Sequence, residues 1–126
     1  MRKLSLRVQA ARQDQELGII WGYASVADIL DEQGDLIPQD ELIRAVYEFM
    51  ENYYRGETTI RVNHGKPAQA VLVESTFHLL GTNVAWFVGV KLLDEDLREA
   101  ARRGEISGFS IGGWAEDDGT PEEPRA

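Results

Sequence analysis

Hydrophobic and polar residues alternate along the first ten positions of the chain. The apolar positions are Leu4, Leu6, Val8 and Ala10. This two-residue period is typical of a half-buried β-strand. A second strand is expected over residues 17–26, where Gly22 indicates either a bulge or a close approach of another backbone segment.

Two segments carry the signals of amphipathic helices. The first begins at Pro38, which suits a first helical turn, and ends near Gly56. Its apolar stripe consists of Leu42, Ile43, Val46, Phe49, Met50 and Tyr53. The second helix is expected over residues 94–103, with Asp94 as N-cap and Gly104 as the stop. Both helices therefore present one side to a core.

The remaining apolar stretches are expected to be strands. Residues 69–80 and 84–93 are typical of a hairpin, residues 60–63 of a short strand, and residues 106–115 of a last strand. Residues 64–67 are expected to form a loop. The order β-β-α-β-β-β-α-β predicts an α+β, mostly β fold: a small, closed or nearly closed, mostly antiparallel β-barrel with about two helices.

Size and composition limit the class of protein. The 126 residues fit one domain over residues 1–115, followed by an acidic, proline-containing flexible tail over residues 116–126. The net charge of −9 argues against a nucleic-acid partner. No apolar run approaches the roughly 20 residues that span a membrane, so no membrane association is expected. Cysteine is absent, which excludes thiol nucleophiles and disulfides and fits a reducing, intracellular setting.

The acidic stretch over residues 28–35 raises the question of a calcium loop. It lacks the alternating ligands and the distal bidentate glutamate of an EF-hand, so an exposed acidic loop is expected. His64 and His78 lie fourteen positions apart and form no metal-ligand pattern. We therefore expect no metal and no cofactor.

The residues with the clearest potential for chemistry are Ser110 and a histidine. Gly108 and Gly112 give Ser110 a Gly-x-Ser-x-Gly setting, but a nucleophile elbow needs a strand before the serine and a helix after it. Here a helix precedes and none follows, so an α/β-hydrolase is not expected. A serine also needs a base. From the residues alone, a turn serine and a loop histidine at His64 are the simpler interpretation.

An ordered set of short motifs favours the catalytic interpretation of Ser110 and His64 instead. The segments are WGYASV (21–26), QGDLI (33–37), HG (64–65), AVLVES (70–75) and GEISGFSIG (104–112). Together they resemble the caudovirus prohead (capsid-maturation) serine proteases, specifically the phage serine proteases of the defective-prophage type. These are distantly similar to the herpesvirus assemblin proteases. The resemblance covers residues 19–115.

The resemblance implies a herpesvirus-protease-like barrel with a serine–histidine site. It assigns Ser110 as nucleophile and His64 as general base. The herpesvirus enzymes use a second histidine after the serine as third member, and no histidine follows Ser110. Glu74 is our choice for this role, with Asp117, Glu116 and His78 as alternatives. Gly112 and Gly113 are candidate backbone donors to the oxyanion.

The resemblance also implies a biological role. We expect a serine endopeptidase that cleaves scaffold and major capsid proteins, and itself, inside the assembling procapsid in the host cytoplasm. A homodimer is expected, because related proteases often dimerise. One alternative is a non-catalytic capsid-assembly or scaffolding module on the same fold. Another is a metal-dependent hydrolase or nuclease that uses the many acidic residues.

Overall fold

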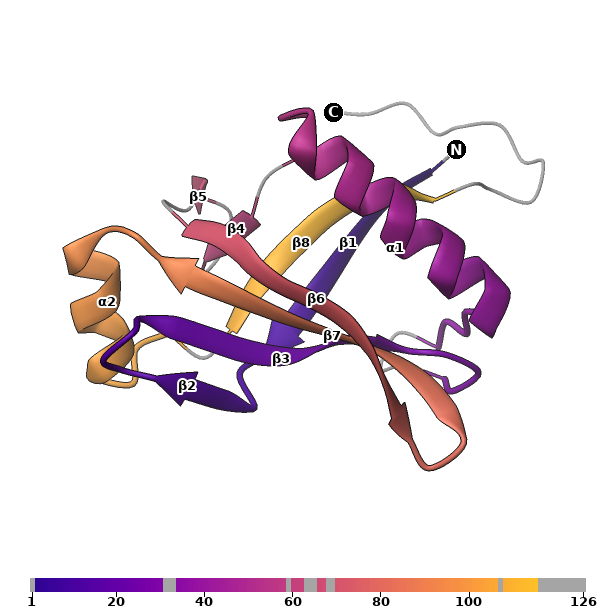
Figure 1. Ribbon diagram of the computed structural model, residues 1–126, viewed down its shortest axis with the longest axis horizontal. Helices are drawn as coiled ribbons and strands as arrows, with labels where there is room; N and C mark the ends of the chain where they lie inside the picture. The colour runs from indigo at the N-terminus through magenta and orange to yellow at the C-terminus, as the bar shows by residue number, and fades with distance from the viewer. Residues whose placement is uncertain are drawn as a thin grey trace.

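The computed structural model describes residues 2–30, 34–58, 60–62, 66–67, 70–106 and 108–115, and defines the backbone alone at 2–7, 61–62, 66–67 and 110–115. Eight strands and two helices are present in this part of the chain (Figure 1). In order, they are β1 (Arg2–Gln9), β2 (Arg12–Asp14), β3 (Ile19–Val26), α1 (Gln39–Tyr54), β4 (Ile60–Val62), β5 (Lys66–Pro67), β6 (Ala70–Leu80), β7 (Asn83–Leu92), α2 (Glu95–Arg102) and β8 (Gly108–Ala115).

The strands form two four-stranded sheets. Their orders are β1-β8-β4-β5 and β2-β3-β7-β6, and every described pairing is antiparallel. The α+β, mostly antiparallel prediction is therefore confirmed. No closed barrel is seen: β1 packs against β3 and β4 approaches β6, but the described residues do not join the two sheets into one closed ladder.

Strands β1 and β3 belong to different sheets but come into close contact at Gly22. A Cβ atom at Gly22 would lie 2.2 Å from the carbonyl oxygen of Gln9, so the end of β1 passes over β3 in direct backbone contact. Ala11 N–H then donates to the Trp21 carbonyl at 2.8 Å, and the chain turns into β2, which takes the edge of β3. The close approach predicted at Gly22 is thus confirmed.

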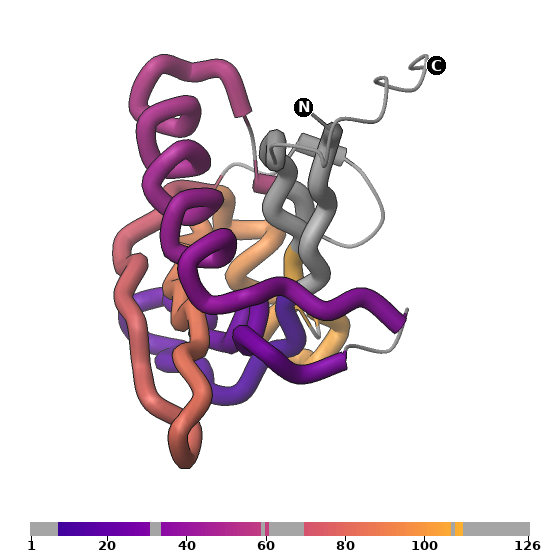
Figure 2. The backbone as a smooth tube through the Cα atoms, turned by 90° about the vertical axis from the view of Figure 1, so that its right-hand side faces the viewer, coloured from indigo at the N-terminus to yellow at the C-terminus, as the bar shows by residue number. Residues whose placement is uncertain are grey.

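The core lies between the two sheets and the helices. Leu42, Val46 and Phe49 of α1 are buried, as the apolar stripe predicts. The Phe49 ring packs edge-on against Trp86 of β7 with centroids 5.3 Å apart. Figure 2 shows α1 running alongside the strands. This packing makes the stripe on α1 part of the core.

Strand β7 is the central element of its sheet and is buried on both faces. Ala85 and Val88 are fully buried although they lie on opposite faces of the strand. Its partner β6 differs from expectation. The register shifts between Leu72 and Glu74, so Leu72 and Phe77 both pack against the core although the simple alternation put them on opposite faces. A bulge at Val73 exchanges the faces.

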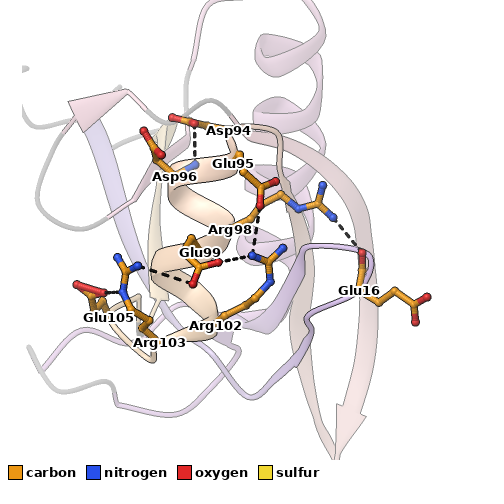
Figure 3. A network of polar contacts seen from close by, with 9 residues as sticks. All are labelled: Glu16, Asp94, Glu95, Asp96, Arg98, Glu99, Arg102, Arg103 and Glu105. Carbon is orange, nitrogen blue, oxygen red and sulfur yellow. Dashed lines mark hydrogen bonds and ion pairs between the residues drawn. The ribbon is translucent and has the colours of Figure 1, made fainter.

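The short strands and the helix ends differ in how well the sequence marks them. Strand β2 follows the first predicted strand and was not predicted, and β5 lies within the predicted loop at residues 64–67. The Asp94 side chain accepts from Asp96 N–H at 3.0 Å and caps α2 as predicted (Figure 3).

Residues 116–126 lie outside the described residues. Within the described residues, no helix is long and apolar enough to cross a membrane.

Charged side chains make contacts within α2 and one contact between α2 and the rest of the domain. Arg102 donates to Glu99 at 2.6 Å and to Glu95 at 3.3 Å, and these hydrogen bonds raise the pKa of Arg102 (Figure 3). Arg98 reaches away from the helix and donates to the Glu16 carbonyl at 2.9 Å. This long-range contact attaches α2 to the turn between β2 and β3.

Candidate active site

Ser110 lies on β8, which occupies the middle of its sheet between β1 and β4. Its direct partners are Arg7 on β1 and Arg61 on β4. The neighbouring position Phe109 is buried and pairs with Val8, which is also buried. Because successive residues of a strand belong to opposite faces, Ser110 is placed on the face directed away from the core.

One of the two strands next to β8 is β4, which precedes His64 in the sequence. Strand β4 runs antiparallel to β8, from Ile60 opposite Ile111 to Val62 opposite Phe109. His64 follows two positions after Val62 and lies outside the described residues. The Ser110–His64 pairing therefore stays a prediction. One observation favours the pairing. Strand β4, which ends two positions before His64, is a direct neighbour of the strand that carries Ser110.

Gly108, two positions before Ser110, has a structural role. A Cβ atom at Gly108 would lie 2.1 Å from the carbonyl oxygen of Val8, so β1 passes too close for any side chain. The first glycine of the Gly-x-Ser-x-Gly pattern is therefore required by the contact between β1 and β8. No strand–turn–helix elbow is involved, since β8 is an extended strand from Gly108 to Ala115.

Glu74 lies on β6 in the other sheet, and its carboxylate has a well-defined partner. The indole N–H of Trp21 donates to Glu74 Oε1 at 2.9 Å. Gly89, which pairs with both residues, leaves room for this contact, because a Cβ there would meet the indole ring at 2.8 Å. Arg12 covers the other side of the same indole, with its guanidinium carbon 4.1 Å from the ring centroid.

The Trp21 bond does not exhaust the hydrogen-bonding capacity of Glu74. A carboxylate offers about four lone-pair sites on two oxygens, and the indole occupies one of them. Strand β6 also approaches β4, the strand that leads to His64. The assignment of Glu74 as third member stays a prediction. Sequence reasoning missed Trp21 as its donor because the contact spans 53 positions.

His78 lies on β6 and belongs to an aromatic cluster. Its ring stacks on Phe87 with centroids 4.4 Å apart, and its Nδ1 lies 3.1 Å from the Tyr23 hydroxyl. These contacts give His78 a structural role on the surface of the sheet. Glu116 and Asp117, which also carry carboxylates suited to the third position, lie outside the described residues.

A concave surface lies at the end of β3 and encloses about 250 Å³. Its lining consists of Tyr23, Ala24, Ser25, Val26, Ile29, Leu30, Asp35 and Ile37. The lining is largely apolar and holds no histidine, so Ser25 has no imidazole base among these residues. Across the described residues, no group of three or more acidic or histidine side chains could hold a metal ion.

The described part of the chain thus defines a small α+β domain whose candidate site is a serine on a central strand. A family model described as "Putative phage serine protease XkdF" matches residues 7–118, and the chain belongs to this family. The match confirms the resemblance to phage serine proteases. No curated protein and no solved structure gives a match, and the similarity to herpesvirus proteases stays a prediction.

Proposed function

We propose that this protein is a serine endopeptidase of the prohead type, with Ser110 as nucleophile and His64 as general base. The observation that carries the proposal is the pairing of β4 with β8 in a chain that belongs to a phage serine protease family. This pairing puts the serine beside the strand that leads, two residues on, to the histidine. The resemblance described from the sequence also assigns these roles to the two residues.

The proposed reaction is acyl transfer to water. His64 accepts the proton of the Ser110 hydroxyl as Oγ attacks the scissile carbonyl, and then gives it to the leaving amine. Water, deprotonated by His64, hydrolyses the acyl-enzyme and regenerates the serine. Glu74 is proposed to hold the imidazole in the reactive tautomer. Backbone N–H groups near Gly112 and Gly113 are proposed to stabilise the oxyanion.

The proposed substrates are scaffold and major capsid proteins, together with the protease itself, cleaved inside the procapsid in the host cytoplasm. Membership of a phage serine protease family supports the protease activity on which this role depends. A homodimer is proposed as the working form. Tyr47 and Tyr54 support it: they lie on the outer side of α1 with 66% and 80% of their surfaces exposed, and they offer aromatic surface to an interface.

Co-expression with the scaffold and capsid proteins of the same phage tests the proposal. Mass spectrometry of the products should show defined cleavage with the wild-type protein and none with Ser110→Ala or His64→Ala. Ser107→Ala, in the same segment, is the matched control and should cleave normally. If both active-site variants cleave like the wild type, the mechanism is wrong. Binding to scaffold without any cleavage would favour the non-catalytic assembly module.

A further inference from the structure

The sheet that carries Ser110 is basic in an otherwise acidic protein. Its four strands β1, β4, β5 and β8 contain Arg2, Lys3, Arg7, Arg61 and Lys66 and no acidic residue. The whole chain has a net charge of −9. The positive charge is therefore concentrated on the strands around the proposed nucleophile.

Two of these basic residues flank Ser110 directly. Arg7 on β1 and Arg61 on β4 are its partners in the two ladders. Neighbouring strands lie about 4.8 Å apart, and directly paired residues belong to the same face of a sheet. Lys3 lies on this face as well, because it is four positions before Arg7 on the same strand. The register thus places three cationic residues on the face of Ser110.

We propose that Arg7 and Arg61 make the site selective for acidic polypeptide segments, with a glutamate or aspartate within about two residues of the scissile bond. Arginine is the side chain best suited to carboxylates, because its planar guanidinium can form two parallel hydrogen bonds with them. The two arginine positions lie about 4.8 Å from Ser110 on either side, and two residues of extended peptide span about 7 Å, so only carboxylates close to the scissile bond lie near these positions. This inference rests on the proposed function and names its substrate class.

The charge distribution favours an acidic peptide over a nucleic acid. A polyanion long enough to extend past the three basic positions would meet the acidic remainder of the protein and be repelled. A polypeptide with one or two carboxylates beside the scissile bond is attracted by the basic residues near Ser110 and carries no further negative charge for the acidic remainder to repel.

A binding experiment in the Ser110→Ala background tests the inference without requiring cleavage. The probes are a short fluorescent peptide with two glutamates and its counterpart with two glutamines. We expect the glutamate peptide to bind about tenfold more tightly, with the difference shrinking as salt is added. Arg7→Gln and Arg61→Gln together should reduce the difference to less than about twofold. Arg55→Gln, which removes one charge at the end of α1, should leave it unchanged.

Cleavage profiling gives the second arm. Peptides from a digested bacterial lysate are incubated with the wild-type and double-variant proteins, and new termini are identified by mass spectrometry. We expect acidic residues to be enriched near the sites cut by the wild type and not near those cut by the double variant. Thermal unfolding of each variant checks that the fold is intact.

The two arms separate failure of this inference from failure of the proposed function. Equal binding of the two peptides, or the same loss in the Arg55→Gln control, overturns the inference even if cleavage occurs. Tighter binding of a short single-stranded DNA than of the glutamate peptide also overturns it. Selective peptide binding without cleavage by the wild type keeps the inference and contradicts the protease assignment.

Discussion

The indole N–H of Trp21 donates to Glu74 Oε1 at 2.9 Å, across two strands that flank β7 in one sheet. The carboxylate proposed to orient His64 is therefore held in place by a residue far away in the sequence. In serine proteases the orienting acid is itself fixed by hydrogen bonds, and its carboxylate holds the imidazole tautomer. Trp21 is suited to be such a support.

Replacing Glu74 by glutamine separates the two roles of this side chain. The glutamine carbonyl can still accept from Trp21, so we expect the free energy of unfolding to change by less than about 1 kcal/mol. The amide cannot stabilise an imidazolium as a carboxylate does, so cleavage should fall at least about 100-fold. Urea unfolding and the rate of scaffold cleavage measure the two effects.

Trp21→Phe is the companion variant. It removes the donor and keeps the carboxylate, so we expect stability to fall by about 1 kcal/mol and cleavage to fall less than in Glu74→Gln. Wild-type cleavage rates in Glu74→Gln would mean that Glu74 only accepts from Trp21 and that another residue orients the histidine.

Local sequence patterns were sufficient to identify most elements of this fold. The apolar stripe on α1 and the capping residue Asp94 predicted both helices, because helix period and capping depend on residues within a few positions. The two strands missed, β2 and β5, have three and two residues, too few for alternation to show. Their pairing depends on neighbouring strands instead.

Long-range geometry accounts for what the patterns missed. The bulge at Val73 exchanges the faces of β6, and no local signal in AVLVES marks it. The neighbours of Ser110 could not be derived either, because the pairing of Arg7, Ser110 and Arg61 depends on which strands lie side by side. Alternation predicts a strand and its faces but not its partners.

Gly108→Ala should show that the glycine before Ser110 is required by packing. The new Cβ would lie 2.1 Å from the Val8 carbonyl oxygen, and this oxygen belongs to a paired strand that cannot move aside freely. We expect a loss of at least about 2 kcal/mol in the free energy of unfolding, measured with urea.

Gly81→Ala is the matched control for that substitution. Gly81 has a φ of +64° in an open turn, with no atom near the position of a Cβ. We expect Gly81→Ala to lower the free energy of unfolding by about 1 kcal/mol, from backbone strain alone. Equal losses in the two variants would show that β1 moves away from Gly108 at little cost.

Arg98 should stabilise the domain through its contact with the turn between β2 and β3. Its side chain donates to the Glu16 carbonyl at 2.9 Å and packs against Gly18, where a Cβ would lie 2.5 Å from Arg98 Nε. Arg98→Ala loses both contacts, and we expect it to cost about 1–2 kcal/mol, measured by thermal unfolding.

Arg55→Ala is the surface control for Arg98. Arg55 pairs with Glu51 at 2.8 Å, but the two side chains are 61% and 59% exposed, so its removal should change stability by less than about 0.5 kcal/mol. If Arg98→Ala is equally mild, α2 is held by its apolar contacts alone.

Removal of divalent cations should leave cleavage unchanged. A serine nucleophile with a histidine base needs no metal, because the serine hydroxyl, deprotonated by the imidazole, is the nucleophile that a metal-bound water would otherwise supply. We expect the same rate of scaffold cleavage with and without excess EDTA, and complete loss in Ser110→Ala under both conditions.

The opposite pattern would contradict the serine mechanism. If EDTA abolishes cleavage, a divalent cation restores it and Ser110→Ala retains it, the chemistry belongs to a metal-dependent hydrolase. Its acidic ligands would then have to include residues beyond those described, since the described residues form no group of three or more potential ligands.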